Sequence, residues 1–227
     1  MGRHIWGRGV STLQMQTLTD SPCNLCSREC GVNRKQGEKG YCFSLDHPVV
    51  ARAALHMWEE PCISGEMGSG AVFFAGCSLR CVYCQNFELA RGRKGREVST
   101  EQLSDIFLSL QGQGAANINL VTPDHFTLAV IPAVRMAREK GLTLPVIYNC
   151  SGYEKEELIE SLRGTVDIFL VDFKYMEEEL AQKYSSAPDY PEVAEKALAR
   201  MLSLTGDPVF DERLSLIHIS EPTRRVV

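Results

Sequence analysis

The segment VDIFLVDFKY, residues 166–175, restricts the folds open to this chain. Its apolar residues form a nearly continuous run, so neither face of the strand suits water, which is typical of the interior of a parallel sheet. Three comparable runs precede it in the sequence, and they are GAVFFAG at 70–76, NINLVTP at 117–123 and LPVIYNC at 144–150. The sequence therefore predicts four buried strands.

Helical patterns separate these strands. Ser99 and Gln102 are spaced as a capping box, and apolar residues follow at helical intervals. Further helices are predicted over 126–140, with Pro132 near its first turn or at a kink, over 153–164, and from Pro191 to Gly206. Alternating strands and helices favour parallel strands joined by right-handed crossovers, which fits both an open doubly wound sheet and a partial (β/α) barrel.

Three cysteines directly follow the first of these strands. Cys77, Cys81 and Cys84 define the cysteine loop, residues 77–84. Functional groups of (β/α) barrels collect in the loops after the strands, so this position favours the partial barrel. Asn149 ends the third strand, and Asp172 and Lys174 end the fourth. We expect these side chains to converge with the cysteines on one rim.

The chain has nine cysteines, and an odd number argues against a fully paired disulfide framework. Clustered cysteines in a reducing compartment more often bind metal. Besides the cysteine loop, a second group lies near the N-terminus, at Cys23, Cys26, Cys30 and Cys42. Cys62 and Cys150 stand apart and are interpreted as ordinary buried thiols.

The spacing of the cysteine loop favours an open metal site. A structural zinc site normally uses four ligands, whereas three close thiolates can hold three irons of a 4Fe-4S cluster and leave the fourth iron free for another ligand. The gaps also differ from those of ferredoxins. Tyr83 places a flat ring beside the last cysteine, against which an adenine could pack.

At these residues a family resemblance becomes visible. FFAGCSLRCVYCQN resembles the cluster loop of the radical S-adenosylmethionine (radical SAM) superfamily, which has CxxxCxxC with an aromatic residue before the last cysteine. Further blocks, taken in order, are similar to the pyruvate formate-lyase activating enzyme-related radical SAM proteins, and they are CNLCSRECGVNR, MWEEPCISGEMGSGAVFFAGC, NINLVTPDHF, VIYNCSGY and VDIFLVDFKY. The likeness extends from Cys23 to Arg213.

The resemblance implies an oxidoreductase with a 4Fe-4S cluster on Cys77, Cys81 and Cys84 and S-adenosylmethionine bound to the fourth iron. An electron would cleave the sulfonium to methionine and a 5'-deoxyadenosyl radical, which abstracts hydrogen from a substrate, and the product could be an activated glycyl radical enzyme. A flavodoxin or ferredoxin would be the reductant. No catalytic residue beyond the cluster ligands is expected. The expected cofactor-binding residues are Tyr83, Thr122, Asn149, Asp172 and Lys174.

Two parts of the motif leave alternatives open. DFK at 172–174 resembles the Asp-x-Lys of glycyl-radical activating enzymes, where the lysine helps to hold the cosubstrate, and the alternative is a surface ion pair. Superfamily members usually carry a GGE-like stretch after the second strand, but here the sequence is VTPDHF. Thr122, Asp124 and His125 are the candidates to replace it, although a lone histidine is more often a hydrogen-bonded core residue.

The N-terminal cysteines define a predicted metal-binding module and linker over residues 21–62, before a partial barrel at 63–213. Their segment of roughly 20 residues is too short to build its own core, so we expect zinc or a second iron-sulfur cluster on Cys23, Cys26, Cys30 and Cys42. The alternative is free thiols packed against the barrel. Residues 1–20 are expected to be a disordered leader.

The C-terminal residues 214–227 have a different character. LSLIHISEPTR resembles the translation of a transposase adapter used in preparing sequencing libraries, so native sequence is expected to stop near Arg213. The alternative is a genuine terminal strand. The superfamily barrel commonly has six strand-helix units and only about four precede this tail, so the fourth strand would lie at an unpaired edge.

Composition narrows the partners. The net charge of -5 argues against gripping nucleic acid or an anionic membrane, so a small molecule or a protein is the expected substrate. No run of about 18 apolar residues and no apolar signal segment occurs, which favours the cytoplasm. The alternative function is a noncatalytic zinc-binding or iron-sulfur electron-transfer protein.

Overall fold

The computed structural model describes residues 18–206, 209–210 and 216–223. Its strands and helices are β1 (Val49–His56), β2 (Ser69–Phe74), β3 (Arg96–Glu97), β4 (Ile118–Val121), β5 (Val146–Cys150), β6 (Ile168–Asp172), β7 (Val209–Phe210), β8 (Leu216–Thr223), η1 (Arg34–Gln36), α2 (Pro61–Ser64), α3 (Phe87–Ala90), α4 (Thr100–Gly112), η2 (Asp124–Phe126), α5 (Thr127–Glu139), α6 (Glu156–Ser161), α7 (Glu178–Ser185) and α8 (Tyr190–Thr205).

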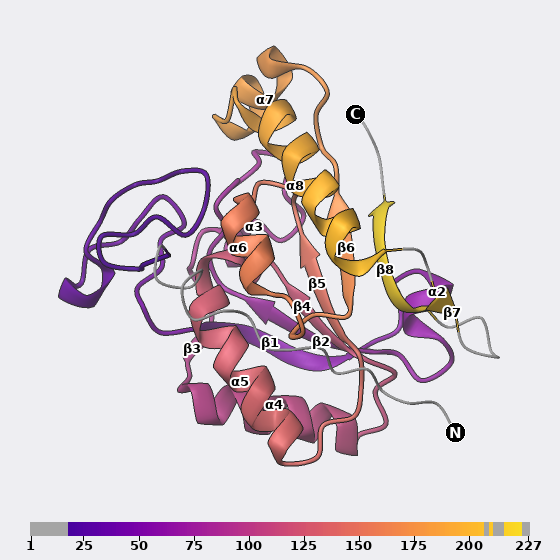
Figure 1. Ribbon diagram of the computed structural model, residues 1–227. Helices are drawn as coiled ribbons and strands as arrows, with labels where there is room; N and C mark the ends of the chain where they lie inside the picture. The colour runs from indigo at the N-terminus through magenta and orange to yellow at the C-terminus, as the bar shows by residue number, and fades with distance from the viewer. Residues whose placement is uncertain (1–17, 207–208, 211–215, 224–227) are drawn as a thin grey trace.

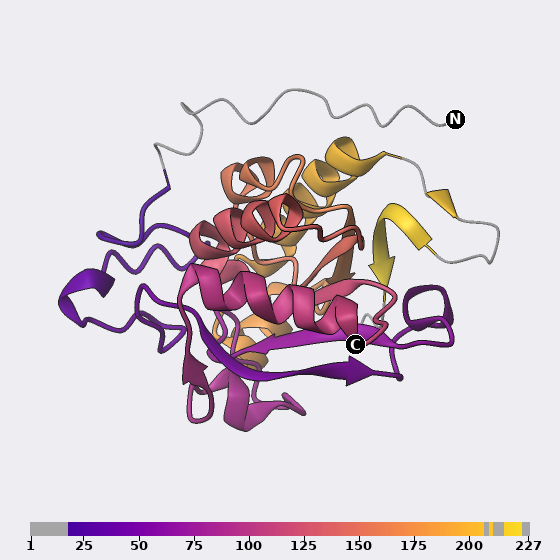
Figure 2. The same cartoon turned by 90° about the horizontal axis from the view of Figure 1, so that it is seen from below.

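One curved sheet organises the described chain, with strand order β3-β1-β2-β4-β5-β6-β8-β7 (Figure 1). Strands β2, β4, β5, β6 and β8 run parallel, whereas β1, β3 and β7 are antiparallel to their neighbours. Helices α4 and α5 pack side by side against one face of the sheet (Figures 1 and 2). This α/β arrangement confirms the predicted partial (β/α) barrel of the radical SAM type with a cysteine-rich N-terminal module.

The four predicted strands all form; β4, β5 and β6 lie within their predicted ranges, and β2 begins one residue earlier than predicted, at Ser69. Their outward residues build the main core against the helices, and Val72, Leu120, Tyr148 and Phe169 in this core are fully buried. The capping box of α4 also forms, because Gln102 N–H donates to Ser99 Oγ at 3.1 Å and Ser99 N–H donates to Gln102 Oε1 at 2.9 Å. Hydrophobic patterning and the capping box therefore predicted these strands and the start of α4.

Strand β1 was not predicted. Its sequence VVARAALH does not alternate regularly between apolar and polar residues. In the structure, a bulge shifts the register between Val50 and Arg52, so the two faces of the strand do not follow a simple alternation. The strand pairs antiparallel with β2 and carries the short strand β3 on its outer side. Residues 49–56, which the sequence assigned to the N-terminal module and linker, are therefore part of the sheet.

Strand β8 lies beside β6. It is formed by Leu216–Thr223, within the segment that resembles an adapter translation, and it pairs parallel with Ile168–Asp172. The expectation that the fourth strand lies at an unpaired edge is wrong for this chain. An apolar strand edge offers unpaired N–H and C=O groups to any extended segment, so this pairing does not reveal the origin of the tail. Residues 214–215 and 224–227 of the predicted tail lie outside the described part.

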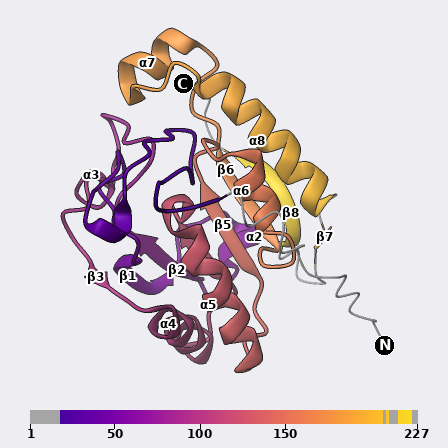
Figure 3. The same cartoon turned by 60° about the vertical axis from the view of Figure 1, so that its left-hand side comes forward.

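The cysteine-rich segment, residues 18–48, is called here the N-terminal module. It is mostly irregular and packs beside the cysteine loop and α3 (Figure 3). Arg34 donates to the His125 carbonyl at 2.7 Å, and Lys155 Nζ lies 2.5 Å from Glu29 Oε1. These contacts tie the module to loops at the carboxyl ends of β4 and β5. Of the predicted leader 1–20, residues 1–17 lie outside the described part.

Within the described ranges, no helix combines the length and the apolar character that a transmembrane span requires.

Candidate functional site

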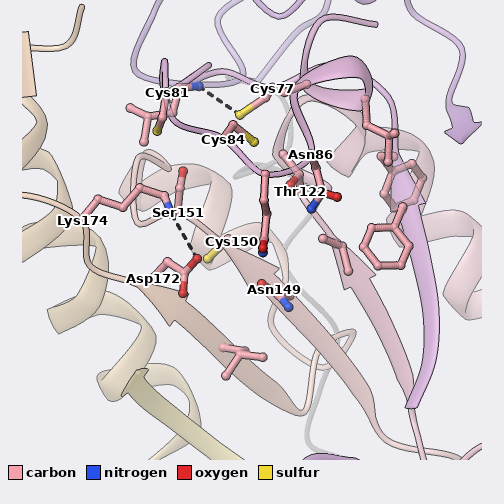
Figure 4. Close-up of a pocket in the computed structure, with 18 of the residues that line it drawn as sticks. Cys77, Cys81, Cys84, Asn86, Thr122, Asn149, Cys150, Ser151, Asp172 and Lys174 are labelled. Carbon is pink, nitrogen blue, oxygen red and sulfur yellow. Dashed lines mark hydrogen bonds and ion pairs between the residues drawn. The ribbon is translucent and has the colours of Figure 1, made fainter. Parts of the chain in front are cut away.

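A cavity of about 770 Å³ lies at the carboxyl ends of the parallel strands. Figure 4 shows the cysteine loop on one side and the ends of the strands facing it. The structure brings to this cavity the three expected cluster ligands and the five expected cofactor-binding residues, namely Cys77, Cys81, Cys84, Tyr83, Thr122, Asn149, Asp172 and Lys174. The roles of these residues remain predictions, but their convergence is a property of the structure.

A glycine turn leads from β2 into the cysteine loop. Gly76 has φ +91°, and a Cβ there would overlap the carbonyl oxygen of Cys42 and the Ser44 hydroxyl. Only glycine therefore allows the N-terminal module to pack this closely on the loop. After the turn, the N–H groups of Leu79 and Arg80 each donate to Cys77 Sγ at 3.4 Å.

The surroundings of Cys77 and Cys84 oppose free thiolates. Desolvation among packed neighbours, with a further contribution from Asp124, raises the pKa of Cys77 to about 12. Burial likewise raises the pKa of Cys84. A bound cation reverses this preference, because a coordinating thiol loses its proton to the metal.

The donor set fits an iron-sulfur cluster in chemistry. Three soft sulfur donors lie on one loop, and two N–H groups already point at one sulfur, as in the outer shell of metal sites. Among the described residues, no group of three or more His, Cys, Asp or Glu side chains is arranged as a ready-made metal site.

Thr122 and Asn149 form the adjoining strand ends. Thr122 N–H donates to the Asn149 carbonyl at 2.9 Å, which links the two loops. Thr122 has φ +57°, a left-handed conformation that is costly for a β-branched residue. Such a residue persists only where its surroundings hold it, and here it lies at the rim of the cavity.

Asp172 and Lys174 form an ion pair with 3.0 Å between Oδ2 and Nζ. Burial alone would lower the pKa of Lys174, but the Asp172 carboxylate, together with the acidic groups of Cys81 and Tyr83, raises that pKa. The pairing that the sequence left as an alternative is therefore present, and both side chains line the cavity. Tyr190 fixes this strand end, because its hydroxyl accepts from Lys174 N–H at 2.8 Å and donates to the Ser151 carbonyl at 2.7 Å.

Tyr83 is half exposed at the cavity. Its hydroxyl donates to the Tyr175 hydroxyl at 2.7 Å, and its ring meets Tyr175 and Tyr184 edge to face. These contacts hold the ring while leaving part of it open, as packing against an adenine would require.

Asp124 and His125 do not line the cavity, unlike Thr122, the third residue expected to replace the GGE-like stretch. Both are buried, with 3.1 Å between His125 Nδ1 and Asp124 Oδ1 and 2.9 Å between His125 Nε2 and the Ala75 carbonyl. Burial opposes ionisation of Asp124, but the neighbouring His125 outweighs it and lowers the pKa of Asp124. Through the Ala75 carbonyl, the pair contacts the chain just before the cysteine loop.

The N-terminal cysteines do not line the cavity. Cys23, Cys26 and Cys42 are buried, and burial raises the pKa of each, whereas Cys30 is exposed. The sulfurs of Cys30 and Cys42 both lie beside Gly40, where a Cβ would come within 2.8 Å of the first and 3.8 Å of the second. A metal on these four residues remains a prediction. The isolated Cys150 is buried at the cavity wall, and Cys62 is half-buried on α2.

Arg28 is a supporting residue that the sequence did not reveal. Its Nε donates to the Ser78 carbonyl in the cysteine loop at 2.8 Å, and its Nη2 donates to the Ser185 carbonyl at the end of α7 at 2.7 Å. The guanidinium carbon lies 3.9 Å from the centre of the Tyr41 ring. Its partners are far away in sequence, so no local pattern could have identified this role.

Comparisons with known proteins point to one family. The Radical SAM superfamily matches residues 71–220. An uncharacterized protein of Methanocaldococcus jannaschii is 25% identical over 77% of this chain and 52% of its own length. The pyruvate formate-lyase-activating enzyme of Clostridium pasteurianum is 27% identical over 48% of this chain and 46% of its own length. The chain thus spans about half the length of the curated relatives it matches.

Proposed function

The chain belongs to the radical SAM superfamily, and from this we propose that it is an enzyme that holds a 4Fe-4S cluster through Cys77, Cys81 and Cys84. The observation that carries the proposal is the shared cavity, which gathers the three cysteines and the residues at the ends of β4, β5 and β6. With S-adenosylmethionine bound, the cluster would supply one-electron cleavage of the sulfonium to methionine and a 5'-deoxyadenosyl radical for hydrogen abstraction.

The cysteine loop would hold the cluster and shield it. The N–H groups of Leu79 and Arg80 stabilise negative charge on Cys77 sulfur, which is one of the ways a protein sets a cluster's potential. Cys81 is buried, and the N-terminal module covers the loop through Arg28. These contacts limit the access of water to the thiolates.

The strand ends would bind S-adenosylmethionine. Lys174 offers its ammonium group to the carboxylate of the methionine part and would share it with Asp172, while Thr122 and Asn149 offer hydrogen-bonding groups nearby. Tyr83 would pack on the adenine. A lysine is suited to this exchange because its ammonium group is a compact charge on a flexible stem.

The wider role follows from the relatives. One relative is named as a pyruvate formate-lyase-activating enzyme, so we include activation of a glycyl radical enzyme as the finer form of the proposal. A flavodoxin or ferredoxin would then supply the electron, and the reaction would take place in the cytoplasm. A second metal on Cys23, Cys26, Cys30 and Cys42 would stabilise the N-terminal module.

The test is anaerobic reconstitution of the chain with iron and sulfide, followed by a reductant and S-adenosylmethionine. We expect 5'-deoxyadenosine and methionine from the wild type and from Cys62→Ala, because Cys62 on α2 does not line the cavity. Cys81→Ala should bind less iron and form neither product. Zinc in place of iron, or equal product from Cys81→Ala, would refute the proposal.

A further inference from the structure

The bulge in β1 turns Arg52 toward the cavity. Val50 lies opposite Phe74, and Arg52 lies opposite Phe73. Phe74 belongs to the core on the helix-covered face and also borders the cavity, whereas Phe73 lines the cavity and is not part of that core. In a regular strand Val50 and Arg52 would share a face, because side chains alternate. The bulge places them on opposite faces, which is a recognised way of redirecting a side chain beside an active site.

Arg52 begins a row of residues that crosses the cavity. Residues of successive strands stand opposite one another in this row and all line the cavity, in the order Arg52, Phe73, Val121, Asn149 and Leu170. Three strand spacings separate Arg52 from Asn149, which is about 14 Å along the sheet. Arg52 therefore lies on the wall away from the strand ends assigned to S-adenosylmethionine, and a second molecule could fit between them.

The guanidinium of Arg52 is unpartnered within the described part of the chain. Among the described residues it makes no hydrogen bond, ion pair or ring contact, unlike Arg28 on the N-terminal module. His56 and Trp58 continue the same wall, and Trp58 is 83% exposed. The acidic side chains on this wall, Glu59 and Glu60, already have interactions of their own. A cation and an open aromatic ring are thus presented to the cavity.

We propose that the β1 wall, formed by Arg52, His56 and Trp58, binds the substrate. Arg52 pairs with an oxyanion group of the substrate, either a carboxylate or a phosphate. The planar guanidinium binds such groups through two parallel hydrogen bonds, which fixes both position and orientation. Trp58 and His56 would cover the adjoining part of the substrate. The assignment to substrate rests on the proposed function, because it requires S-adenosylmethionine on the opposite wall.

The test measures chemical protection of Arg52 in the iron-reconstituted wild-type chain. Phenylglyoxal modifies accessible arginines, and mass spectrometry reads the rate at each site with succinate, inorganic phosphate or chloride at equal ionic strength. At an anion concentration about four times the dissociation constant, modification of Arg52 should slow about fivefold. Arg96 is the matched control, because it is exposed on β3 opposite Val50 and does not line the cavity. Its rate should not change.

The two anions separate the sources of the oxyanion. Protection by succinate alone indicates a carboxylate substrate, and protection by phosphate alone indicates a phosphorylated one. Arg52→Gln should weaken binding of the protecting anion about tenfold or more, while Arg96→Gln should bind as the wild type does. The proposal is overturned if neither anion protects Arg52, if both arginines are protected equally, or if S-adenosylmethionine alone protects Arg52.

The proposed function is measured separately in the same preparation. If the wild type forms 5'-deoxyadenosine but Arg52 is not protected, only the substrate wall is wrong. If an iron-loaded wild type forms no 5'-deoxyadenosine, the proposed function fails whatever the protection shows, and an anion at Arg52 would no longer be assigned to a radical substrate.

Discussion

Single residues set how closely the N-terminal module covers the cysteine loop. Gly76 is the contact point, because its left-handed backbone and missing Cβ leave room for Cys42 and Ser44. Gly76→Ala should lower the free energy of unfolding by about 2–4 kcal/mol, since both strain and overlap with backbone are introduced. Chemical denaturation measures the change.

Gly112 is the matched control for this substitution. It ends α4 with open space around it, so Gly112→Ala should raise the free energy of unfolding by about 0.5–1 kcal/mol. A Gly76→Ala variant as stable as the wild type would show that the module does not press on the loop.

Thr122 offers a second test at this scale. The left-handed conformation costs threonine about 1–2 kcal/mol, and glycine avoids this cost. Glycine in turn loses about 0.5–1 kcal/mol of stability, because it has more conformational freedom in the unfolded chain. Thr122→Gly should therefore keep or slightly raise thermal stability, while losing affinity for S-adenosylmethionine with the hydroxyl. Thr122→Ser, which keeps the hydroxyl, is the control for affinity. A clear loss of stability in Thr122→Gly would mean that the side chain is packed rather than strained.

Among the elements, α4 begins where its sequence predicts. Ser99→Ala removes one half of the capping box and should cost about 1 kcal/mol of stability. Ser109→Ala lies on the same helix, where the hydroxyl makes only an exposed contact with Gln113, and should change little. Equal melting temperatures for the two variants would contradict the capping role.

Arg28 links the N-terminal module to the cysteine loop and to the end of α7. Arg28→Ala removes charged hydrogen bonds to the Ser78 and Ser185 carbonyls and should cost about 2–3 kcal/mol. The amides of residues 77–84 should then exchange with solvent faster than in the wild type, whereas exchange in the distant helix α4 should not change. Arg28→Lys should give an intermediate result, because lysine cannot reproduce the fork. Unchanged amide protection of residues 77–84 in Arg28→Ala would refute the role of Arg28 in holding the cysteine loop.

Prediction from sequence succeeded where the pattern was local. The strands β2, β4, β5 and β6 are continuous apolar runs, and topology places the residues that follow them on one rim, so Asn149 and Lys174 could be located in advance. Strand β1 was missed because its bulge breaks the alternation. Arg28 and Tyr190 were missed because their partners are distant in sequence, and only the folded chain brings them together.

At the scale of the whole molecule, the N-terminal module, the sheet and the crossover helices meet around one cavity. The module covers the cysteine loop, the strand ends supply polar groups, and β1 adds a further wall that carries Arg52. The chain still spans about half the length of its curated relatives.

The most direct measurement is electron paramagnetic resonance of the anaerobically reconstituted and reduced protein, with and without S-adenosylmethionine. We expect a 4Fe-4S signal in the wild type that changes when S-adenosylmethionine binds the open iron, and the same behaviour in Cys62→Ala. In Cys81→Ala the signal should be weak or absent. A cluster whose signal is indifferent to S-adenosylmethionine, or a preparation that carries zinc on these cysteines, would contradict it.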